Sequence, residues 1–471
     1  MNTKLDLTKG SVLQNLLMVA IPTLFVSVVQ MTYNLTDMFW VGKVGSMGLN
    51  ATEAVAAVGT AGYFPWLGFG FIMLVKIGTS VNISHAAGRD DMEDVASYGN
   101  NGLIFMIGFA LIYSMVGFFG ANFYVSIFDL SSANVASYSV DYLRVISMFG
   151  ISMFSVNLFG GVYDGLGKTL STFKVTASGL VLNIILDPIF ILNSVSFFGV
   201  TIGGFGLGVK GAAIATVISQ SFILLIYLVI YSSKRRPFTI NFKKYFDIEK
   251  IKHIFRIGFP VGVQSVLFTS ISIYIGILIS SYGSAVIATQ RLGSQIEALA
   301  WMIASGFQVA LASFVGQNYG AGKLDRIKKG YYTALKLLVP YGIIINIVLF
   351  VFAEQLFSIF LDDPDTLRIG KMYLEILSIS QLFMIVELGT AGAFNGLGKT
   401  YIPSGIGIVG NALRIPFGIL ASITIGFAGI WWVISFSSIL KGTVITVWFL
   451  LYLRKLKIIN NVFFVEKECT L

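Results

Sequence analysis

The sequence contains few charged residues, a single cysteine and two histidines. Asp, Glu, Lys and Arg make up 12% of the 471 residues, about half of the usual share in a soluble protein, so an ordinary soluble enzyme is excluded. The 56% hydrophobic content excludes intrinsic disorder. Cys469 alone cannot form a disulfide scaffold. His85 and His253 lie near predicted loops and far apart, so we expect no histidine-based metal site.

The sequence consists largely of long apolar stretches. A membrane-spanning helix needs about 20 mostly apolar residues, and about twelve stretches meet this need, so we predict an all-α polytopic membrane protein with twelve transmembrane helices. The first run is too long for a signal-peptide core, so we expect it to be retained. The predicted spans are residues 11–37, 51–80, 95–119, 138–162, 169–193, 209–231, 251–280, 286–316, 330–353, 369–395, 401–423 and 427–453.

Lysine and arginine gather in the loops that an even number of spans places on one side. The opposite loops carry few bases and several acids, so the positive-inside rule predicts cytoplasmic termini, and we expect the plasma membrane as the location. This distribution of the +9 net charge favours topology signals over a nucleic-acid partner. The basic set is Lys4, Lys9, Lys234, Arg235, Arg236, Lys243, Lys244, Lys250, Lys252, Lys323, Arg326, Lys328, Lys329, Arg454, Lys455 and Lys457; the opposite set is Lys43, Lys210, Arg368, Asp362, Asp363 and Asp365.

The chain carries an internal duplication. Residues 163–169, YDGLGKT, recur as residues 394–400, FNGLGKT, and four further landmarks recur in the same order at similar offsets. Two homologous six-helix lobes are therefore predicted, related by a pseudo-two-fold axis along the membrane normal, with the substrate cavity between them. We assign residues 1–231 to the N-lobe, 232–250 to a cytoplasmic linker, 251–453 to the C-lobe and 454–471 to a cytoplasmic tail.

The repeated GLGKT sequence resembles the end of a phosphate-binding loop. That loop requires a first glycine, then four residues, then Gly-Lys-Ser/Thr, and Val162 and Ala393 occupy the position of the first glycine. We therefore predict a tight turn between two spans in each lobe.

Polar residues within the predicted spans are candidate functional residues, because such groups are costly in a membrane. In span one, five of them recur at spacings of three and four and share one helical face. Asp187 in span five is followed by Pro188, which weakens the local helix, and Asp37 and Asp187 are expected at one depth. The two series are Thr23, Ser27, Gln30, Asn34 and Asp37 in span one, and Thr176, Asn183 and Asp187 in span five.

The duplication does not include the two acids. Aligned through the shared landmarks, Asp37 corresponds to Ile275 and Asp187 to Ile415, so packing common to both lobes does not need them. A buried carboxylate serves coupling either by taking a proton or by binding a hard cation together with amide and hydroxyl oxygens. Asn183 and Thr216 suit the second case, which would be a Na⁺ site. A purely structural hydrogen-bonded pair is the alternative.

The second half has a polar stripe of its own in span eight. Glu387 and Arg414, in spans ten and eleven, are at similar depth and could form an ion pair. Both structural pairing and substrate contact remain open for these groups. The stripe consists of Gln290, Ser294, Glu297, Trp301, Ser305 and Gln308, and our candidates for the substrate cavity are Gln30, Asn157, Gln290, Glu297, Trp301 and Glu387.

Several stretches together resemble the MATE family, the multidrug and toxic compound extrusion transporters. They span nearly the whole chain, from about residue 13 to 450: QMTYNLTDMFWVG at 30–42, NIILDPIF at 183–190, GVKGAAIAT at 208–216, GQNYGAG at 316–322 and the two GLGKT turns. The resemblance implies twelve helices in two lobes and antiport of organic, often cationic, compounds against Na⁺ or H⁺.

The resemblance also implies where the coupling site lies. The site residues of DinF-like and archaeal members map onto Asp37, Asn183, Asp187 and Thr216, with Asn34 beside them. Members of the NorM type also use C-lobe acids, and those positions correspond to Phe268 and Met384 here, which favours the N-lobe subtype.

We therefore predict a monomeric exporter that needs no cofactor besides its coupling ion, with organic molecules and membrane lipids as partners. The alternative is a lipid-linked oligosaccharide flippase of the same superfamily, which would be expected to have more cationic residues along its cavity. We predict no enzyme, because no nucleophile with a plausible base is visible in the sequence.

Overall fold

The computed structural model describes residues 6–128, 130, 132–197, 200–234, 236–360 and 363–468. Of the charged residues in the predicted topology, Lys4, Arg235 and Asp362 lie outside these ranges, as does Cys469; the side chain of Lys457 is not described either.

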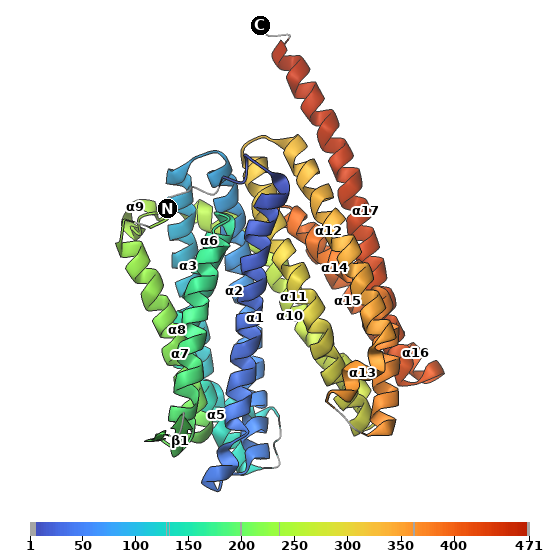
Figure 1. Ribbon diagram of the computed structural model, residues 1–471. Coiled ribbons are helices and arrows are strands. Elements are labelled where there is room, and N and C mark those ends of the chain that lie inside the picture. The colour runs from blue at the N-terminus through green and yellow to red at the C-terminus, as the bar shows by residue number, and fades with distance from the viewer. Residues whose placement is uncertain are drawn as a thin grey trace.

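The first half of the chain forms one helical bundle, which we call the N-lobe (Figure 1). Its fourth span is bent by 54° between α5 and α6. The bend falls at Gly150, where a larger residue would collide with Tyr113 and Ser114 of α3. The elements are α1 Val12–Val41, the 3₁₀ turn η1 Val44–Met47, α2 Ala51–Gly88, α3 Met92–Phe119, α4 Ala121–Ser126, α5 Ala133–Met148, α6 Gly150–Gly165, α7 Thr169–Ile191, β1 Ser194–Phe197, β2 Val200–Gly203 and α8 Gly208–Ser232.

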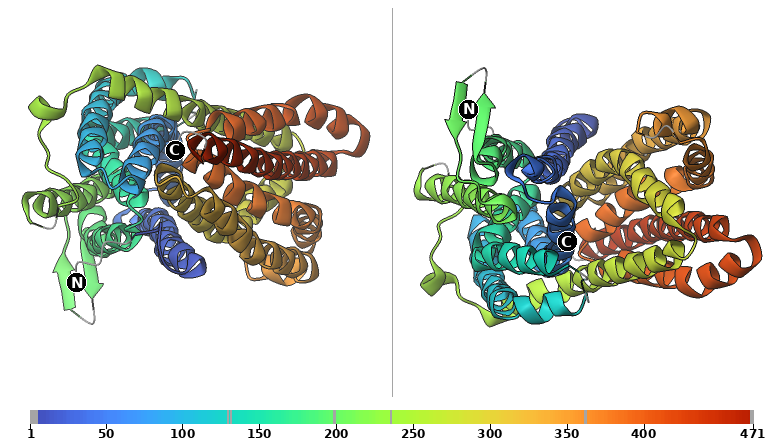
Figure 2. Two further views of the ribbon diagram at one scale, coloured as in Figure 1. Left: turned by 90° about the horizontal axis from the view of Figure 1, so that it is seen from above. Right: turned by 90° about the horizontal axis from the view of Figure 1, so that it is seen from below.

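The second half forms the other bundle, the C-lobe, beside the first (Figure 2). Its elements follow a short helix in the linker. They are α9 Phe242–Tyr245 in the linker, then α10 Ile248–Ser280, α11 Ser284–Gly320, α12 Leu324–Val351, α13 Ala353–Ser358, α14 Pro364–Gly396, α15 Tyr401–Ala412, α16 Arg414–Ile425 and α17 Phe427–Glu468.

The predicted set of spans is confirmed. In the described part of the chain, 11 helical segments are long and apolar enough to cross a membrane, and the bent α5 and α6 pair makes up to 12. The antiparallel hairpin of β1 and β2, which pairs Ser194 with Gly203, was not predicted. It occupies the loop between α7 and α8, outside the spans.

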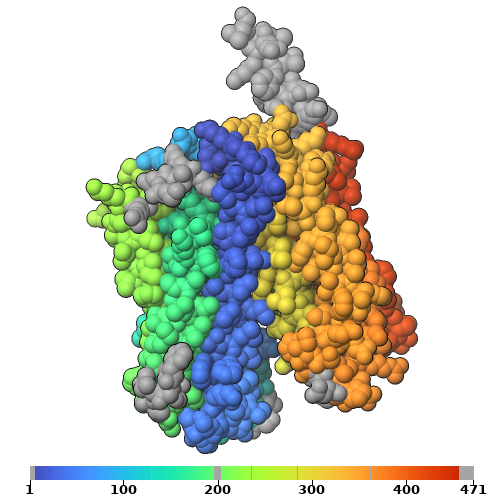
Figure 3. Space-filling model, in the orientation of Figure 1, coloured from blue at the N-terminus to red at the C-terminus, as the bar shows by residue number. Residues whose placement is uncertain are grey.

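The lobes pack against each other at the end that carries the termini and separate toward the other end. The space-filling view shows a cleft between them that opens away from the termini (Figure 3). The contacts follow the duplication, because α2 packs on α10, α1 packs on α11, and α2 crosses α11. The first two pairs join a helix to the counterpart of its neighbour in the other lobe, and the third joins the two counterparts α2 and α11.

Glycines allow the helices to approach closely where the lobes meet. A Cβ atom on Gly88 would collide with the carbonyl oxygen of Gln317, and one on Gly320 would collide with that of His85. Gly258 approaches the carbonyl of Leu74 in the same way. Small residues permit such backbone contact between membrane helices, so these glycines bring the two lobes together on this side.

The two GLGKT sequences are tight turns, as predicted. Gly167 and Gly398 both have a φ of 72°, a left-handed conformation that favours glycine. The ends of the crossing helices then bond to the residues just before these turns in the opposite lobe. The His85 ring lies 2.7 Å from the Gly396 carbonyl oxygen, and the Gln317 amide donates to the Gly165 carbonyl at 3.1 Å.

The segment before α1 docks on the C-lobe. Leu7 is completely buried, and its N–H donates to the side chain of Gln317 at 3.3 Å. Its carbonyl accepts hydrogen bonds from Asn318 and Arg326, each at 3.2 Å. The start of the N-lobe chain is therefore fastened to the other lobe.

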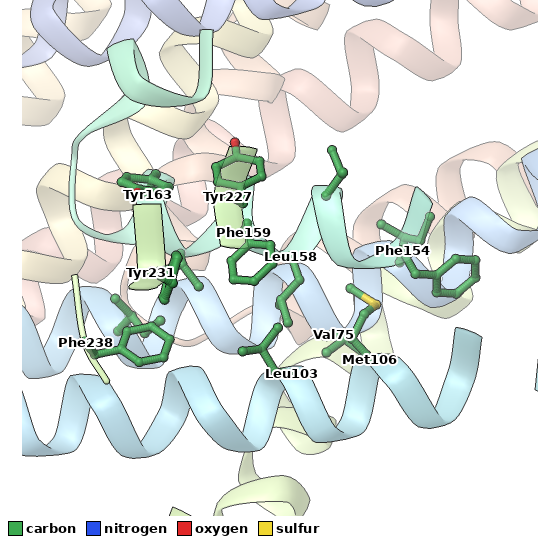
Figure 4. Close-up of a cluster of buried hydrophobic side chains, with 14 of the residues drawn as sticks. Val75, Leu103, Met106, Phe154, Leu158, Phe159, Tyr163, Tyr227, Tyr231 and Phe238 are labelled. Atoms are coloured by element: carbon green, nitrogen blue, oxygen red, sulfur yellow. The ribbon is translucent and has the colours of Figure 1, made fainter. Parts of the chain in front are cut away.

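The segment before α10 docks on the N-lobe in a corresponding way. Asn100 donates to the Thr239 carbonyl at 3.0 Å, and Asn101 donates to the Tyr245 carbonyl at 2.6 Å. Phe238 packs edge-on against Tyr231, with ring centroids 5.1 Å apart, at the end of a buried aromatic cluster (Figure 4). The segment that precedes each lobe in the chain is therefore bound to the other lobe.

Candidate ion-coupling site

Two acids, an amide and a hydroxyl meet inside the N-lobe near its open end. Asp37 lies one turn before the end of α1, and Asn183 and Asp187 occupy successive turns near the end of α7. The Asn183 amide donates to Asp187 at 2.8 Å and to Asp37 at 3.3 Å, and the Thr216 hydroxyl of α8 donates to Asp37 at 3.0 Å. All four residues of the predicted coupling set therefore lie together.

The local sequence explains this arrangement. Asn183 and Asp187 are four residues apart, so they lie above one another on one face of α7. Pro188 is inside the helix, which continues through it to Ile191. Because proline has no N–H, the carbonyl four residues earlier, that of Ile184, loses its helical donor.

The cluster is buried and strongly acidic. The exposed fraction is 8% for Asp37 and 0% for both Asn183 and Asp187. Among the described residues, no Lys, Arg or His nitrogen lies within 4.0 Å of either carboxylate. Two buried carboxylates without a base are not stable as two bare charges, so the site favours a bound proton or cation.

The unused oxygen atoms point to the same chemistry. The Oδ1 atom of Asn183 and the Oδ2 atom of Asp187 are buried and have no hydrogen-bond partner in the structure. Carboxylate, amide and hydroxyl oxygens are the ligands that a hard cation prefers. The residues present therefore fit Na⁺ at Asp37, Asn183, Asp187 and Thr216, and they equally fit a proton held between the acids.

Two tyrosines border the cluster and were missed by the sequence analysis. Tyr33 lies one turn before Asp37 on α1 and has a buried hydroxyl with no hydrogen-bond partner in the structure. Tyr142 of α5 is 8% exposed, and both tyrosines lie within electrostatic range of Asp37 and Asp187. The four-residue spacing could have identified Tyr33, whereas only the folded bundle brings Tyr142 to the site.

The polar stripes of α1 and α11 meet at the closed end of the cleft. The hydroxyl oxygens of Ser27 and Ser305 are 3.4 Å apart across the lobes. Beyond this contact α1 continues toward the open end through Gln30 and Asn34, which are both exposed. Neither is joined to the acids by a described hydrogen bond, so Asn34 lies beside the cluster without a bond to it. Asn157 of α6 is half-buried and donates to the carbonyl of Met153 at 2.9 Å.

The α11 stripe makes polar contacts within the C-lobe. Glu297 is 4% exposed and accepts a hydrogen bond from Gln381 of α14 at 2.9 Å. The Trp301 indole donates to the same Gln381 at 3.1 Å, and Gln290 accepts from the Trp431 indole at 2.6 Å. One oxygen of Glu297 is buried without a partner. This stripe therefore joins three helices and retains an unused acceptor.

Glu387 and Arg414, for which an ion pair was one of the two open possibilities, do not pair with each other in the structure. The Glu387 carboxylate pairs with Lys441 of α17 at 3.2 Å. Arg414 instead donates to the hydroxyls of Ser437 and Ser438, at 2.7 and 3.0 Å. Arg414 follows the break between α15 and α16, and this break directs its guanidinium toward α17.

The C-lobe has no counterpart of the acid cluster. Ile275 is 4% exposed and belongs to a hydrophobic core cluster, against which Ile415 also packs. Asn411, which corresponds to Asn183, is buried with its Oδ1 atom unpartnered. The two lobes share a scaffold and differ in the chemistry placed in it.

Two bundles of apolar helices around a cleft, with a pair of buried acids that lacks a base in the N-lobe, are the architecture of a membrane transporter. The MatE family model matches residues 22–189 and 260–420, once in each lobe. The chain therefore belongs to the MATE family of transporters.

Comparisons with individual proteins agree with this assignment. The chain is 27% identical over 435 residues to the probable multidrug resistance protein NorM of Thermotoga maritima, covering 89% of this chain and 88% of that one. It is 23% identical to the probable multidrug resistance protein YpnP of Bacillus subtilis, with 90% and 92% covered. A solved outward-facing conformation of a multidrug resistance MATE transporter has the same fold, with a TM-score of 0.85, 22% identity, and 97% and 99% covered.

Proposed function

We propose that the protein exports organic, cationic or amphipathic compounds from the cytoplasm in exchange for H⁺ or Na⁺. The observation that carries this proposal is the buried pair of Asp37 and Asp187 inside the N-lobe, which has no base within 4.0 Å among the described residues. A cation or proton that binds there compensates the charge and biases the N-lobe between two conformations.

The substrate cavity in this proposal is the cleft beyond the contact of Ser27 with Ser305. Gln30 and Asn157 belong to the N-lobe, whereas Gln290, Glu297, Trp301 and Glu387 belong to the C-lobe. Amides, an indole and the carboxylate of Glu297 suit flat, positively charged molecules, because aromatic faces and acids both attract cations, whereas the carboxylate of Glu387 is already paired with Lys441. With both termini in the cytoplasm, the cleft opens outward in this structure.

The coupling site in this proposal lies in the N-lobe, as in the DinF-like and archaeal subgroup. Ile275 and Ile415 at the matching C-lobe positions support it, as do Phe268 and Met384 at the positions of the NorM-type acids. The flippase alternative is less well supported. An ion-coupled exporter needs a buried acid cluster to bind its coupling ion, whereas a flippase has no evident need for one. We propose that the protein works as a monomer in the plasma membrane.

Imposed ion gradients in proteoliposomes test the proposal. Purified protein is reconstituted with a fluorescent cationic dye, and either a Na⁺ gradient at fixed pH or a pH gradient without Na⁺ is applied. One of the two gradients is expected to drive the dye up its concentration gradient, which also identifies the coupling ion. If neither gradient moves the dye or any of a panel of organic cations, the proposed antiport is wrong.

A further inference from the structure

Lys441 is a buried base in the middle of α17. Its side chain is 8% exposed, and its ammonium nitrogen lies 3.2 Å from one oxygen of Glu387, whose side chain is 14% exposed. The other oxygen of Glu387 is buried and has no hydrogen-bond partner in the structure. A membrane-embedded lysine is costly unless it is paired, so the pair needs an explanation beyond topology.

The fold makes room for this lysine. A Cβ atom on Gly410 of α15 would collide with the aliphatic stem of Lys441. Gly410 is buried in α15, and α15 packs on α17. The glycine thus creates the space through which the ammonium group reaches α14.

The charges around Lys441 are balanced. Arg414 lies within electrostatic range of Glu387 and Glu297, and Lys441 lies within range of Glu387 and Arg414. Within this wider range the C-lobe group has two acids and two bases, although of the two acids only Glu387 has a base within 4.0 Å among the described residues. The N-lobe pair, Asp37 and Asp187, has two acids and no base within 4.0 Å among the described residues.

This difference determines which acids can exchange an ion. A buried carboxylate requires a positive partner, which is a proton, a metal cation or a basic side chain. A proton or Na⁺ can leave during transport, whereas a lysine is covalently attached to its helix. A carboxylate held by lysine is therefore not free to bind an ion from solution.

We propose that Lys441 is a tethered cation that occupies the Glu387 carboxylate and prevents Glu387 from carrying a second coupling ion. This inference rests on the proposed antiport and limits its stoichiometry, because Glu387 then exchanges no ion. Arg414 does not take part in this pairing, because its guanidinium is hydrogen-bonded to Ser437 and Ser438 of α17.

The ratio of dye inside to outside at steady state reports the number of coupled ions. We would compare wild type, Lys441→Met and Lys441→Met with Glu387→Gln in proteoliposomes, at zero membrane potential and a tenfold gradient of the coupling ion. One additional ion raises the steady-state dye ratio about tenfold. We expect this increase in Lys441→Met and a return to the wild-type ratio in the double variant.

Two results are distinguishable from each other. A wild-type protein that moves no dye under either gradient overturns the antiport itself. Equal dye ratios in wild type and an actively transporting Lys441→Met overturn only the role of Lys441, and they assign the pair to structure.

A second measurement does not depend on the folding of Lys441→Met. Binding of the coupling ion is measured on purified Asp37→Asn with Asp187→Asn, in which Lys441 is intact. We expect no ion binding that depends on Glu387. Stoichiometric binding that disappears when Glu387→Gln is added would show that the lysine does not block the C-lobe acid, and the inference would be rejected.

Discussion

Asp37→Asn should abolish coupling while leaving the fold almost unchanged. An asparagine has the shape of a protonated aspartate, so the variant resembles the ion-loaded state and cannot release its charge compensation. The structure allows the cost to be worked out. Asp37 accepts one hydrogen bond from Asn183 and one from Thr216, and the new amide can keep one as acceptor. Losing the other costs about 1 kcal/mol, which removal of one of two like charges partly offsets.

Asp164→Asn is a matched control in the same lobe. Asp164 is a buried acid, 7% exposed, but it pairs with Lys76 at 3.3 Å. The substitution leaves the lysine without a counter-ion, which costs about 3 kcal/mol for a fully buried pair. The Lys76 side chain is 21% exposed, so the actual cost should be lower. We therefore expect Asp37→Asn to lose coupling and keep most of its stability, and Asp164→Asn to lose stability and keep its coupling.

The assay combines thermal unfolding in detergent with gradient-driven dye efflux from proteoliposomes. Asp37→Asn should melt close to wild type and show no gradient-driven efflux. Asp164→Asn should melt lower and keep coupled efflux at a temperature where it is folded. Wild-type coupling in Asp37→Asn, or equal loss of coupling in both variants, would refute the assignment.

Two further predictions concern the terminus side of the lobe interface. Gly258→Val should prevent closure there, because its side chain would collide with the carbonyl of Leu74, and dye efflux should be lost. The control is Gly276→Val on the same helix, where the added Cβ meets no atom within 4 Å; this variant should transport normally. Arg326→Gln removes hydrogen bonds to the segment before α1 and should increase spin-label distances across the terminus side; Lys328→Gln, which removes an exposed charge, should leave them unchanged.

The sequence predicted the fold well because membrane spans are encoded locally. Each apolar run appears as a helix or a helix pair. The bend between α5 and α6 was not predicted, since it depends on how Gly150 packs against another helix. Hydropathy indicates that a segment crosses the membrane, but it does not show where the helix bends or breaks.

The acid cluster was predictable because helical spacing and depth were enough. Asp37, Asn183 and Asp187 could be placed on inward faces at one level without knowledge of the tertiary structure. Lys441 was missed because a single base barely changes the hydropathy of a long span, and its partner lies on a helix distant in sequence. The partners of Arg414 could not be predicted, because the hydroxyls of Ser437 and Ser438 lie on another span, α17, and only the fold brings them to the guanidinium.

The central claim is that the N-lobe acids couple ion movement to transport without being needed for transport itself. The double variant Asp37→Asn with Asp187→Asn should therefore be compared with wild type in two assays. In dye counterflow, preloaded dye exchanges for labelled dye without a gradient of Na⁺ or H⁺. In the second assay, an imposed ion gradient drives accumulation of the dye. We predict that counterflow continues while accumulation is lost under both Na⁺ and H⁺ gradients. Accumulation at the wild-type level in this double variant would contradict the account.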